Sequence, residues 1–195
     1  MNLDDAKKYI LNRLQHEINK NYSYHNVSHT INVYEACDRI AKEENLSKNK
    51  TDLLLTAALF HDSGMLISYI EHEEASTLMT KEILPEFDYS PEEIEEINKM
   101  ILTTKLPQSA KTLEEKILCD ADLDYLGRDD FYMIAHQLKY EWKINGINKL
   151  SLREWYELQI SFLDNHKYFT QTESNLREKK KLKHLKEIKN LLEEN

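Results

Sequence analysis

Glycine and proline are scarce in this chain, with three of each among 195 residues, whereas an average protein carries about 12% of the two together. Tight turns between strands depend on both residues, so their scarcity excludes an all-β fold and argues against a series of β-α-β units. The three glycines, Gly64, Gly127 and Gly146, are too widely spaced for a glycine-rich phosphate loop. The composition therefore predicts an all-α fold, in a single compact helical bundle.

Cysteine and long hydrophobic runs are also rare. Cys37 and Cys119 stand alone, without the closely spaced pair of a thiolate zinc site, and we expect two buried, reduced thiols. The longest nearly apolar run, Leu53 to Phe60, is far shorter than the ~20 residues of a membrane-spanning helix. The N-terminal residues lack the apolar stretch of a secretion signal. These features predict a cytoplasmic protein without a membrane partner.

Basic residues are fewer than acidic residues, which gives a formal net charge of −9. Ten acidic residues and one lysine lie between positions 71 and 98. An acidic body does not attract duplex nucleic acid, and the basic residues after position 171 follow the spacing of an ordinary amphipathic helix. We therefore expect no nucleic-acid partner, while the excess of carboxylates leaves room for a divalent cation. The amphipathic terminal helix also leaves a homodimer open.

Apolar residues recur at helical spacing along most of the chain. Ser90 and Ser151 each begin a capping box, and Ser47 is expected to cap a helix at 48–60. That helix is apolar nearly all round, which places it at the centre of the core. The predicted helices cover 3–18, 27–44, 48–60, a segment from 91, 113–127, 129–143, 152–165 and 173–193. No linker rich in glycine, serine or proline divides them, so we expect one domain over residues 1–195.

Polar residues with metal-binding chemistry follow the apolar segments. His61 and Asp62 come directly after the most apolar helix, and three aspartates follow the apolar run that ends at Cys119. Burying such side chains is costly unless a partner pairs with them. Imidazole and carboxylate suit Mn, Fe, Co, Ni or Zn, so a divalent cation bound by separate segments satisfies them. The candidates are His25, His29, His61, Asp62, Asp120, Asp122 and Asp124.

His25 and His29 are four residues apart and are expected on one face at the start of the helix at 27–44. A single histidine near a core, however, is more often a hydrogen-bonded structural residue than a metal ligand. The three aspartates resemble half of a calcium loop but lack its glycine and terminal glutamate. The spacing of these residues therefore permits a metal site without establishing it.

Three segments together resemble the HD-domain superfamily of metal-dependent phosphohydrolases, whose ligands follow an H…HD…D order on a bundle of helices. They are Tyr24–Thr30, Ala57–Asp62 and Asp120–Leu123. Phe162–Thr170 and Leu176–Glu178 are similar to the tails of small stand-alone proteins described as predicted HD-superfamily phosphohydrolases. The resemblance implies one HD-type domain, with a motif-bearing core at about 20–130 and a helical C-terminal extension at 129–195.

The resemblance also implies that His29, His61, Asp62 and Asp122 bind one divalent ion, with Mn, Co, Ni, Fe, Zn and Mg all open. Asp122 is chosen among its neighbours because it matches the family's Ala-Asp-x-Leu pattern. The implied activity is hydrolysis of a phosphate ester of a small molecule, with a nucleotide as the first candidate, by a metal-activated water. Asp62 would lie beside that water as a catalytic residue.

Glu73 and His72 are the two candidates for the general acid, a role that typically contributes roughly 10²–10⁴-fold. Glu73 matches an acidic-x-x-Ser pattern of the family, but it also lies in a run of acids that are mostly surface residues. Two branches match less well: Met65 replaces an acid of some nucleotidases, and Ser63–Leu66 replaces an acidic pair of the (p)ppGpp hydrolases. The substrate therefore stays open.

An acidic protein needs cations to hold an anionic substrate. Lys105 follows two threonines and precedes Pro107, where hydroxyls and an ammonium can meet a phosphate, although a surface lysine is the simpler interpretation. The substrate-binding candidates are His25, Lys105, His166 and Arg177.

Two other functions are compatible with this ligand pattern. A di-iron oxygenase of the same superfamily requires further histidines between His61 and Asp122, and only His72 lies there. A non-enzymatic nucleotide-sensing module typically loses a ligand, whereas all four are present here. The metal-dependent phosphohydrolase is therefore the favoured prediction.

Overall fold

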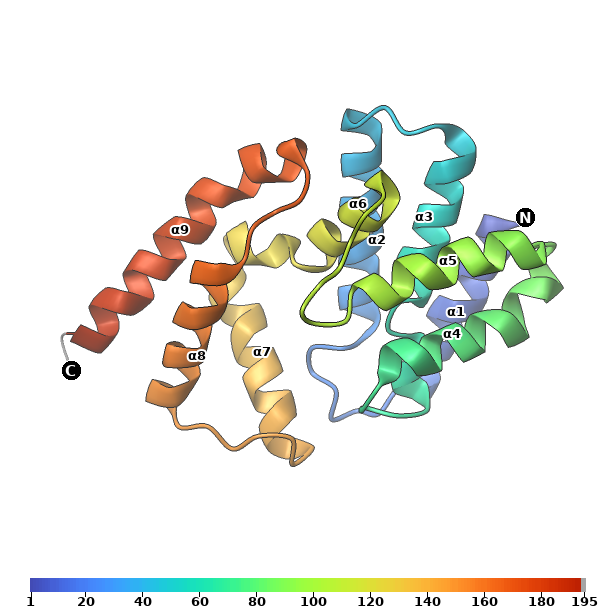
Figure 1. Ribbon diagram of the computed structural model, residues 1–195. Helices are drawn as coiled ribbons and strands as arrows, with labels where there is room; N and C mark the ends of the chain where they lie inside the picture. The colour runs from blue at the N-terminus through green and yellow to red at the C-terminus, as the bar shows by residue number, and fades with distance from the viewer. Residues whose placement is uncertain (194–195) are drawn as a thin grey trace. The chain divides into compact units, whose positions relative to one another are not determined.

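The structure is a computed structural model that describes residues 1–193. Helices are the regular secondary structure throughout these residues, which confirms the all-α fold (Figure 1). The α-helices are α1 (Leu3–Glu17), α2 (Val27–Glu43), α3 (Lys48–Phe60), α4 (His72–Ile83), α5 (Pro91–Thr103), α6 (Leu113–Asp122), α7 (Phe131–Ile144), α8 (Leu152–Asn165) and α9 (Gln171–Glu193). Short 3₁₀ turns are η1 (Ser63–Leu66), η2 (Leu84–Phe87) and η3 (Asp124–Gly127).

The chain forms two compact units. Residues 1–20 and 25–122 make the first, which contains α1 to α6, and residues 21–24 with those from 123 onward make the second, which contains α7 to α9. The division falls directly after α6, a few residues before the extension expected from position 129. One domain over residues 1–195 stays a prediction.

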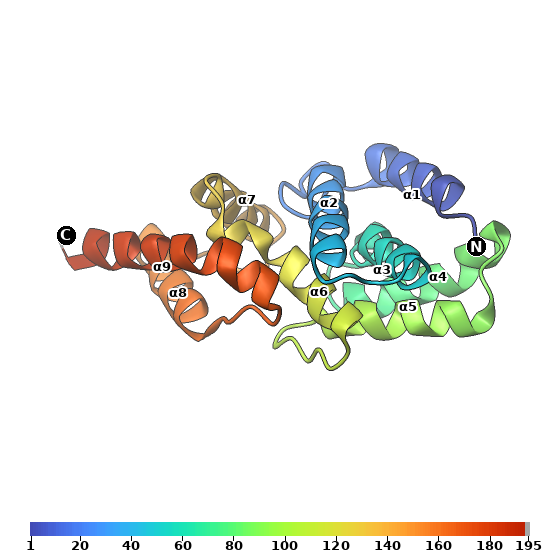
Figure 2. The same cartoon turned by 90° about the horizontal axis from the view of Figure 1, so that it is seen from above.

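Helix α3 runs through the core of the first unit. Every residue from Leu53 to Phe60 is buried, and the helix contacts α1, α2, α5 and α6. Figure 2 shows α3 between α1 and α5, with α2 beside it. The prediction that this nearly all-apolar segment is central is confirmed.

Local capping chemistry sets several helix starts. The Asn26 side chain accepts hydrogen bonds from the backbone N–H groups of Ser28 and His29 and so caps α2. Both expected capping boxes, at Ser90 and Ser151, are present. The expected side-chain cap at Ser47 is wrong, because that residue precedes α3 but makes no capping hydrogen bond.

Helix α4 was not among the helices expected from the sequence. Its buried face consists mainly of small and hydroxyl-bearing residues, with Met79 and Ile83 as its long apolar side chains. The helix follows Glu71, whose backbone adopts a left-handed conformation with φ 55°. The apolar spacing that reveals the other helices is therefore weak here.

The second unit has its own core. Phe131 from α7, Trp155 and Leu163 from α8, and Leu185 and Ile188 from α9 form one buried apolar cluster. Helix α9 packs against α8 and η3. The prediction of an amphipathic α9 is consistent with this packing.

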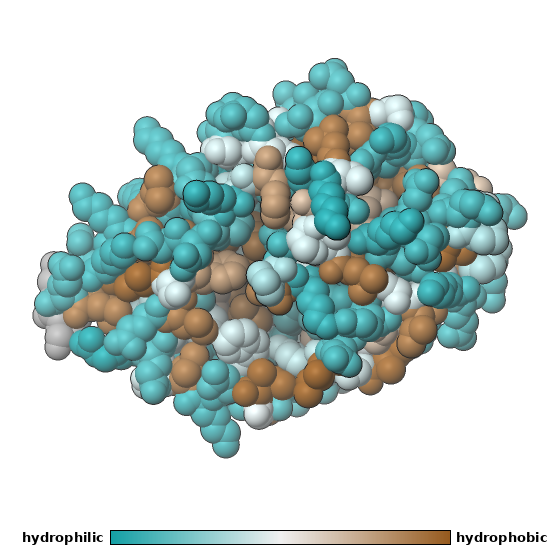
Figure 3. Space-filling view, in the orientation of Figure 1, coloured by the Kyte–Doolittle hydropathy of each residue, from teal (hydrophilic) through white to brown (hydrophobic). Residues whose placement is uncertain are grey.

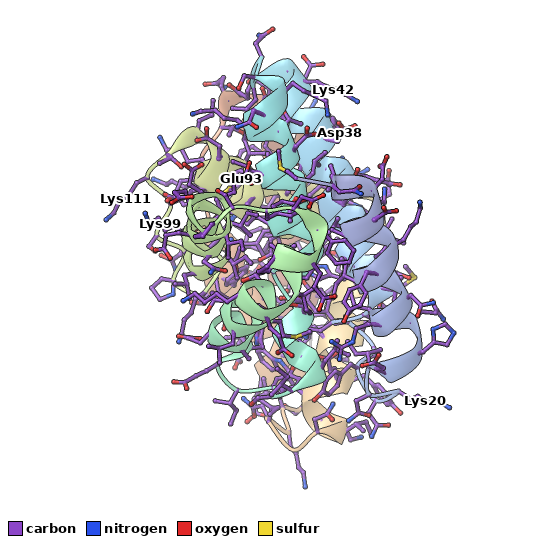
Figure 4. The ribbon with its side chains drawn as sticks, turned by 90° about the vertical axis from the view of Figure 1, so that its right-hand side faces the viewer. Lys20, Asp38, Lys42, Glu93, Lys99 and Lys111 are labelled. Carbon is purple, nitrogen blue, oxygen red and sulfur yellow. The ribbon has the colours of Figure 1, made fainter. Side chains whose placement is uncertain are left out.

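The surface is mainly hydrophilic. Lys20 and Lys111, both exposed, extend away from the ribbon of the first unit (Figure 4). Hydrophilic residues cover most of the face in Figure 3, with apolar residues in small separate patches. Within residues 1–193, no helix has the length and hydropathy that crossing a bilayer requires.

Candidate metal centre

Four side chains converge inside the first unit. The Nε2 atoms of His29 and His61 lie 3.2 Å apart. Asp122 Oδ1 lies 3.2 Å from His29 Nε2 and 3.7 Å from His61 Nε2. Asp62 Oδ2 lies 3.3 and 3.2 Å from the same two nitrogens. The structure thus brings all four predicted ligands together.

Each of these four side chains lies at the end of a helix or in the turn beside it. His29 occupies the first turn of α2, which Asn26 caps. His61 and Asp62 follow the last residue of α3, and Asp122 is the last residue of α6. His61 Nδ1 lies 2.8 Å from the carbonyl oxygen of Ala58, to which it can donate, and that bond leaves Nε2 directed at the cluster.

The residues present fit a divalent cation. Asp62 Oδ2 is buried and forms no hydrogen bond of good geometry, although both imidazoles are close. Two imidazole Nε2 atoms 3.2 Å apart share at most one proton in their neutral forms. His29, His61 and Asp122 each offer an atom within 4.8 Å of the others. Nitrogen and carboxylate donors in this arrangement suit a first-row divalent metal.

The electrostatics of the cluster also call for positive charge. Burial by itself lowers the pKa of His29 and His61, but contact with two carboxylates outweighs it, and both pKa values rise. Burial opposes the ionisation of Asp62 and Asp122, yet the imidazoles lower the pKa of Asp62 well below its usual range and that of Asp122 to about 2. Protons on the imidazoles or a bound cation can balance these two carboxylates.

His72 connects this cluster to α4. Its Nε2 lies 3.4 Å from Asp62 Oδ1 and 3.6 Å from Glu73 Oε1. Glu73 is 9% exposed, unlike the surface acids around it. Burial lowers the pKa of His72, but Asp62 outweighs burial and the pKa rises to about 9. Both candidates for the general acid therefore lie beside the ligand cluster.

His25 is also close, although not as expected. Helix α2 begins at Val27, so His25 precedes the cap and does not share a helical face with His29; that expectation is wrong. The ring centroids of the two histidines are nevertheless 6.2 Å apart. The His25 ring lies 5.4 Å from that of His72 and 5.7 Å from that of Tyr69. Tyr69 was not among the residues expected at the site, because its one sequence signal is its position three residues before His72.

Lys105 lies at the edge of the same unit. Its ammonium pairs with the carboxylate of Glu74, the neighbour of Glu73 on α4. Both side chains are nearly half exposed. Contact of Lys105 with a substrate stays a prediction.

The remaining two candidates belong to the second unit. Arg177 Nε donates to Asp124 Oδ1 at 2.8 Å and lies 3.3 Å from Glu173 Oε1. His166 Nδ1 lies 3.4 Å from the ammonium of Lys181. Both side chains thus have protein neighbours of their own, and their roles in substrate binding stay predictions.

Comparison with known proteins covers the segment that contains these residues. A family model described as HD domain matches residues 26–124, a range that contains all four clustered ligands. An uncharacterized protein of Clostridium beijerinckii is 34% identical over 97 residues, which are 48% of this chain and 61% of that protein. The alignment therefore spans less than two thirds of that relative.

A solved structure has the same fold. It is the crystal structure of a predicted HD superfamily hydrolase from an uncultured Thermotogales bacterium, with a TM-score of 0.64 and 21% sequence identity. The match covers 96% of this chain and 91% of that one. At this level of identity the likeness establishes the fold.

Proposed function

The chain belongs to the HD domain family, and we propose that it is a metal-dependent phosphohydrolase that cleaves a phosphate ester of a small molecule, with nucleotides as the first class to test. The observation that carries this proposal is the buried cluster of two imidazoles and two carboxylates from α2, α6 and the end of α3. A hydrolase name on the solved relative adds support. Conversion of a phosphate ester fits the cluster because phosphoryl transfer depends mainly on charge stabilisation and positioning.

The four ligands would be His29, His61, Asp62 and Asp122. A divalent ion supplies Lewis acidity toward a phosphoryl oxygen and makes hydroxide available near neutral pH. The identity of the ion stays open among Mn, Co, Ni, Fe, Zn and Mg, since mixed nitrogen and oxygen donors select weakly.

The protein's own groups would perform the proton transfers. Asp62 presents Oδ2 to the imidazoles and Oδ1 to His72, so the carboxylate can orient a water molecule. His72 Nε2 lies 3.4 Å from Asp62 Oδ1 and 3.6 Å from Glu73 Oε1, and in its protonated form this imidazole would donate to the leaving oxygen. The Glu73 carboxylate, at that distance from the same nitrogen, would stabilise the protonated form. We therefore assign the general acid to His72 and a supporting role to Glu73.

The surroundings of the cluster favour a substrate with a flat, partly apolar group. The ring centroid of His25 lies within 6 Å of the ring centroids of Tyr69 and His72. Such rings offer surfaces for a base or a sugar. Lys105 can exchange its carboxylate partner for a phosphate, because the pair it forms with Glu74 is solvent-accessible. These features support a nucleotide over a simple aliphatic phosphate.

The experiment is a hydrolysis screen of nucleoside monophosphates, dinucleotides and non-nucleotide phosphate esters with Mn, Co, Ni, Zn and Mg. Asp62→Ala is the inactive comparison, and Asp38→Ala, a surface change on α2 where Asp38 pairs with Lys42, is the matched control. Metal-dependent release of phosphate by the wild type and by Asp38→Ala alone supports the proposal. Equal activity of Asp62→Ala, or a purified protein that binds none of these metals, contradicts it.

Two further measurements separate the alternatives. Two irons per chain with substrate-dependent oxygen uptake would establish an oxygenase in place of a hydrolase. Tight nucleotide binding without turnover under any metal would establish a sensing module.

A further inference from the structure

A single hydroxyl ties the turn that carries His61 and Asp62 to helix α4. Ser76 Oγ donates to the carbonyl oxygen of His61 at 2.7 Å and accepts from the backbone N–H of Gly64 at 2.7 Å. Ser76 is fully buried. The carbonyl it serves lies at the end of α3, where backbone groups have no partner inside the helix. One side chain therefore satisfies a donor and an acceptor on both sides of Asp62.

The turn and α4 also approach at backbone contact distance. A Cβ atom on Gly64 would lie 2.0 Å from the carbonyl oxygen of His72 and 2.6 Å from the backbone nitrogen of Ser76. Gly64 is thus required for close approach, since no larger residue fits without displacing α4. The same close approach brings the Ser76 hydroxyl within reach of both backbone groups.

Helix α4 carries the proposed proton donor as well. His72 and Glu73 precede Ser76 by four and three residues, so the three share one face of α4. A shift of the turn relative to α4 would change the distance from Asp62 Oδ1 to His72 Nε2, now 3.4 Å. It would also move His61 Nε2 away from His29 Nε2.

We propose that Ser76 is a positioning residue of the metal centre. Its hydroxyl holds the His61–Asp62 pair in the arrangement that binds the cation and fixes that pair relative to His72. The inference rests on the proposed function, because it assigns Ser76 to the metal site of that function. Supporting hydrogen bonds around metal ligands typically contribute 10–100-fold in metal affinity or activity.

The test compares three variants of the full chain after removal of bound metal. Ser76→Ala removes the hydroxyl, and Ser76→Cys keeps a similar size with a weaker donor. Thr80→Val is the matched control, because Thr80 is a fully buried residue on α4 whose hydroxyl has the Thr77 carbonyl oxygen and the Asn98 side chain as partners rather than the turn. Calorimetric titration with Mn²⁺ measures affinity, and thermal unfolding without metal measures the structural cost of each change.

We expect Ser76→Ala to weaken Mn²⁺ binding about 10- to 100-fold and Ser76→Cys to weaken it by less. Thr80→Val should lower the melting temperature with less than about a threefold change in affinity. The inference is overturned by wild-type affinity in both Ser76 variants, or by an equal loss of affinity in Thr80→Val. If Ser76→Ala does not fold, the Mn²⁺ affinity of Ser76→Cys tests the inference.

The same data distinguish the positioning role of Ser76 from the proposed phosphohydrolase activity. Mn²⁺ binding that depends on Ser76 in a protein without phosphatase activity would overturn the proposed reaction and leave the positioning role intact. A wild type that binds no divalent metal would overturn both.

Discussion

His72 Nε2 lies 3.4 Å from Asp62 Oδ1, the oxygen of that carboxylate that faces away from the two clustered imidazoles. One oxygen of Asp62 therefore contacts the two clustered imidazoles, and the other contacts His72 on helix α4. A single carboxylate links the residues that would bind the cation to the residue that would transfer the proton. Substitutions at these two positions should consequently have different effects.

Asp62→Asn should abolish tight metal binding. The amide keeps the size of the side chain but removes its charge, so the cluster loses one of its two carboxylates. We expect at least about a 100-fold loss of Mn²⁺ affinity, somewhat beyond the range for supporting residues, and loss of turnover. Metal analysis of the purified protein checks the first outcome, with Asp38→Asn as the surface control. Unchanged metal content in Asp62→Asn would contradict the ligand assignment.

His72→Gln should lower kcat without preventing metal binding. The imidazole of His72 contacts Asp62 Oδ1 from α4, whereas the two clustered imidazoles lie beside Oδ2 of the same carboxylate. Loss of a general acid typically reduces the rate by roughly 10²–10⁴-fold. Steady-state kinetics with metal affinity measured in parallel check the result, and His16→Gln, on exposed α1 sequence, is the control.

Glu73→Gln separates the two candidates for the general acid. If Glu73 only orients His72, its amide variant should retain more activity than His72→Gln. A larger loss of kcat in Glu73→Gln than in His72→Gln would reverse the assignment.

Gly64→Ala should destabilise the first unit strongly. The added methyl would meet backbone atoms of α4 rather than flexible side chains, and overpacking of this kind costs about 1–3 kcal/mol or more. Gly146→Ala is the comparison, because it has open space around it but a positive φ of 70°, and it should cost only the ~1–2 kcal/mol of left-handed backbone. Urea unfolding of both variants checks the order; a smaller loss in Gly64→Ala would contradict the close approach of α4.

Acid should destabilise the second unit through His166. Burial, reinforced by Lys181, lowers the pKa of His166 to about 4. The groups around it are Lys181 at 3.4 Å, the ring of Tyr168 at 4.7 Å and the ring of Phe162 at 6.1 Å, while Glu178 pairs with Lys181. The unfolded chain, with a usual pKa near 6.5, then binds more protons than the folded chain between about pH 6.5 and 4. Stability conferred by neutral His166 is therefore complete above pH 6.5 and is lost as the pH falls through this window.

The magnitude of this effect is at most about 3.5 kcal/mol, from roughly 1.4 kcal/mol per unit of pKa shift. Denaturant unfolding at pH 7.0 and 4.5 measures it, and His166→Gln should reduce the difference between the two pH values. The same pH dependence in His166→Gln and wild type would show that other groups cause the acid sensitivity.

Much of the fold follows from local rules that act within a few residues. Apolar spacing locates α1 and α3, and apolar spacing together with capping locates α2, α5 and α8, because burial of one face and pairing of terminal N–H groups are decided locally. Helix α4 escaped prediction because its buried face consists largely of alanine, serine and threonine. The role of Ser76 depends on how closely α4 approaches Gly64, and that distance is a property of the packed chain.

The candidate metal centre could be predicted from the sequence to a similar extent. The cost of burying His61 and Asp62 after an apolar helix indicates a partner, and the structure places His29 and Asp122 beside them. Spacing alone could not select among the three aspartates after Cys119. In the folded chain, Asp122 ends α6 inside the cluster, whereas Asp124 accepts a hydrogen bond from Arg177 in the second unit.

The four proposed ligands span positions 29 to 122, most of the length of the first unit. A cation bound only by the folded arrangement therefore acts as a removable cross-link among α2, α3 and α6. By mass action, free metal at 100 times its dissociation constant adds about 2.7 kcal/mol to the free energy of unfolding. The supply of divalent ions would then govern the lifetime of the protein against proteolysis as well as its catalytic turnover.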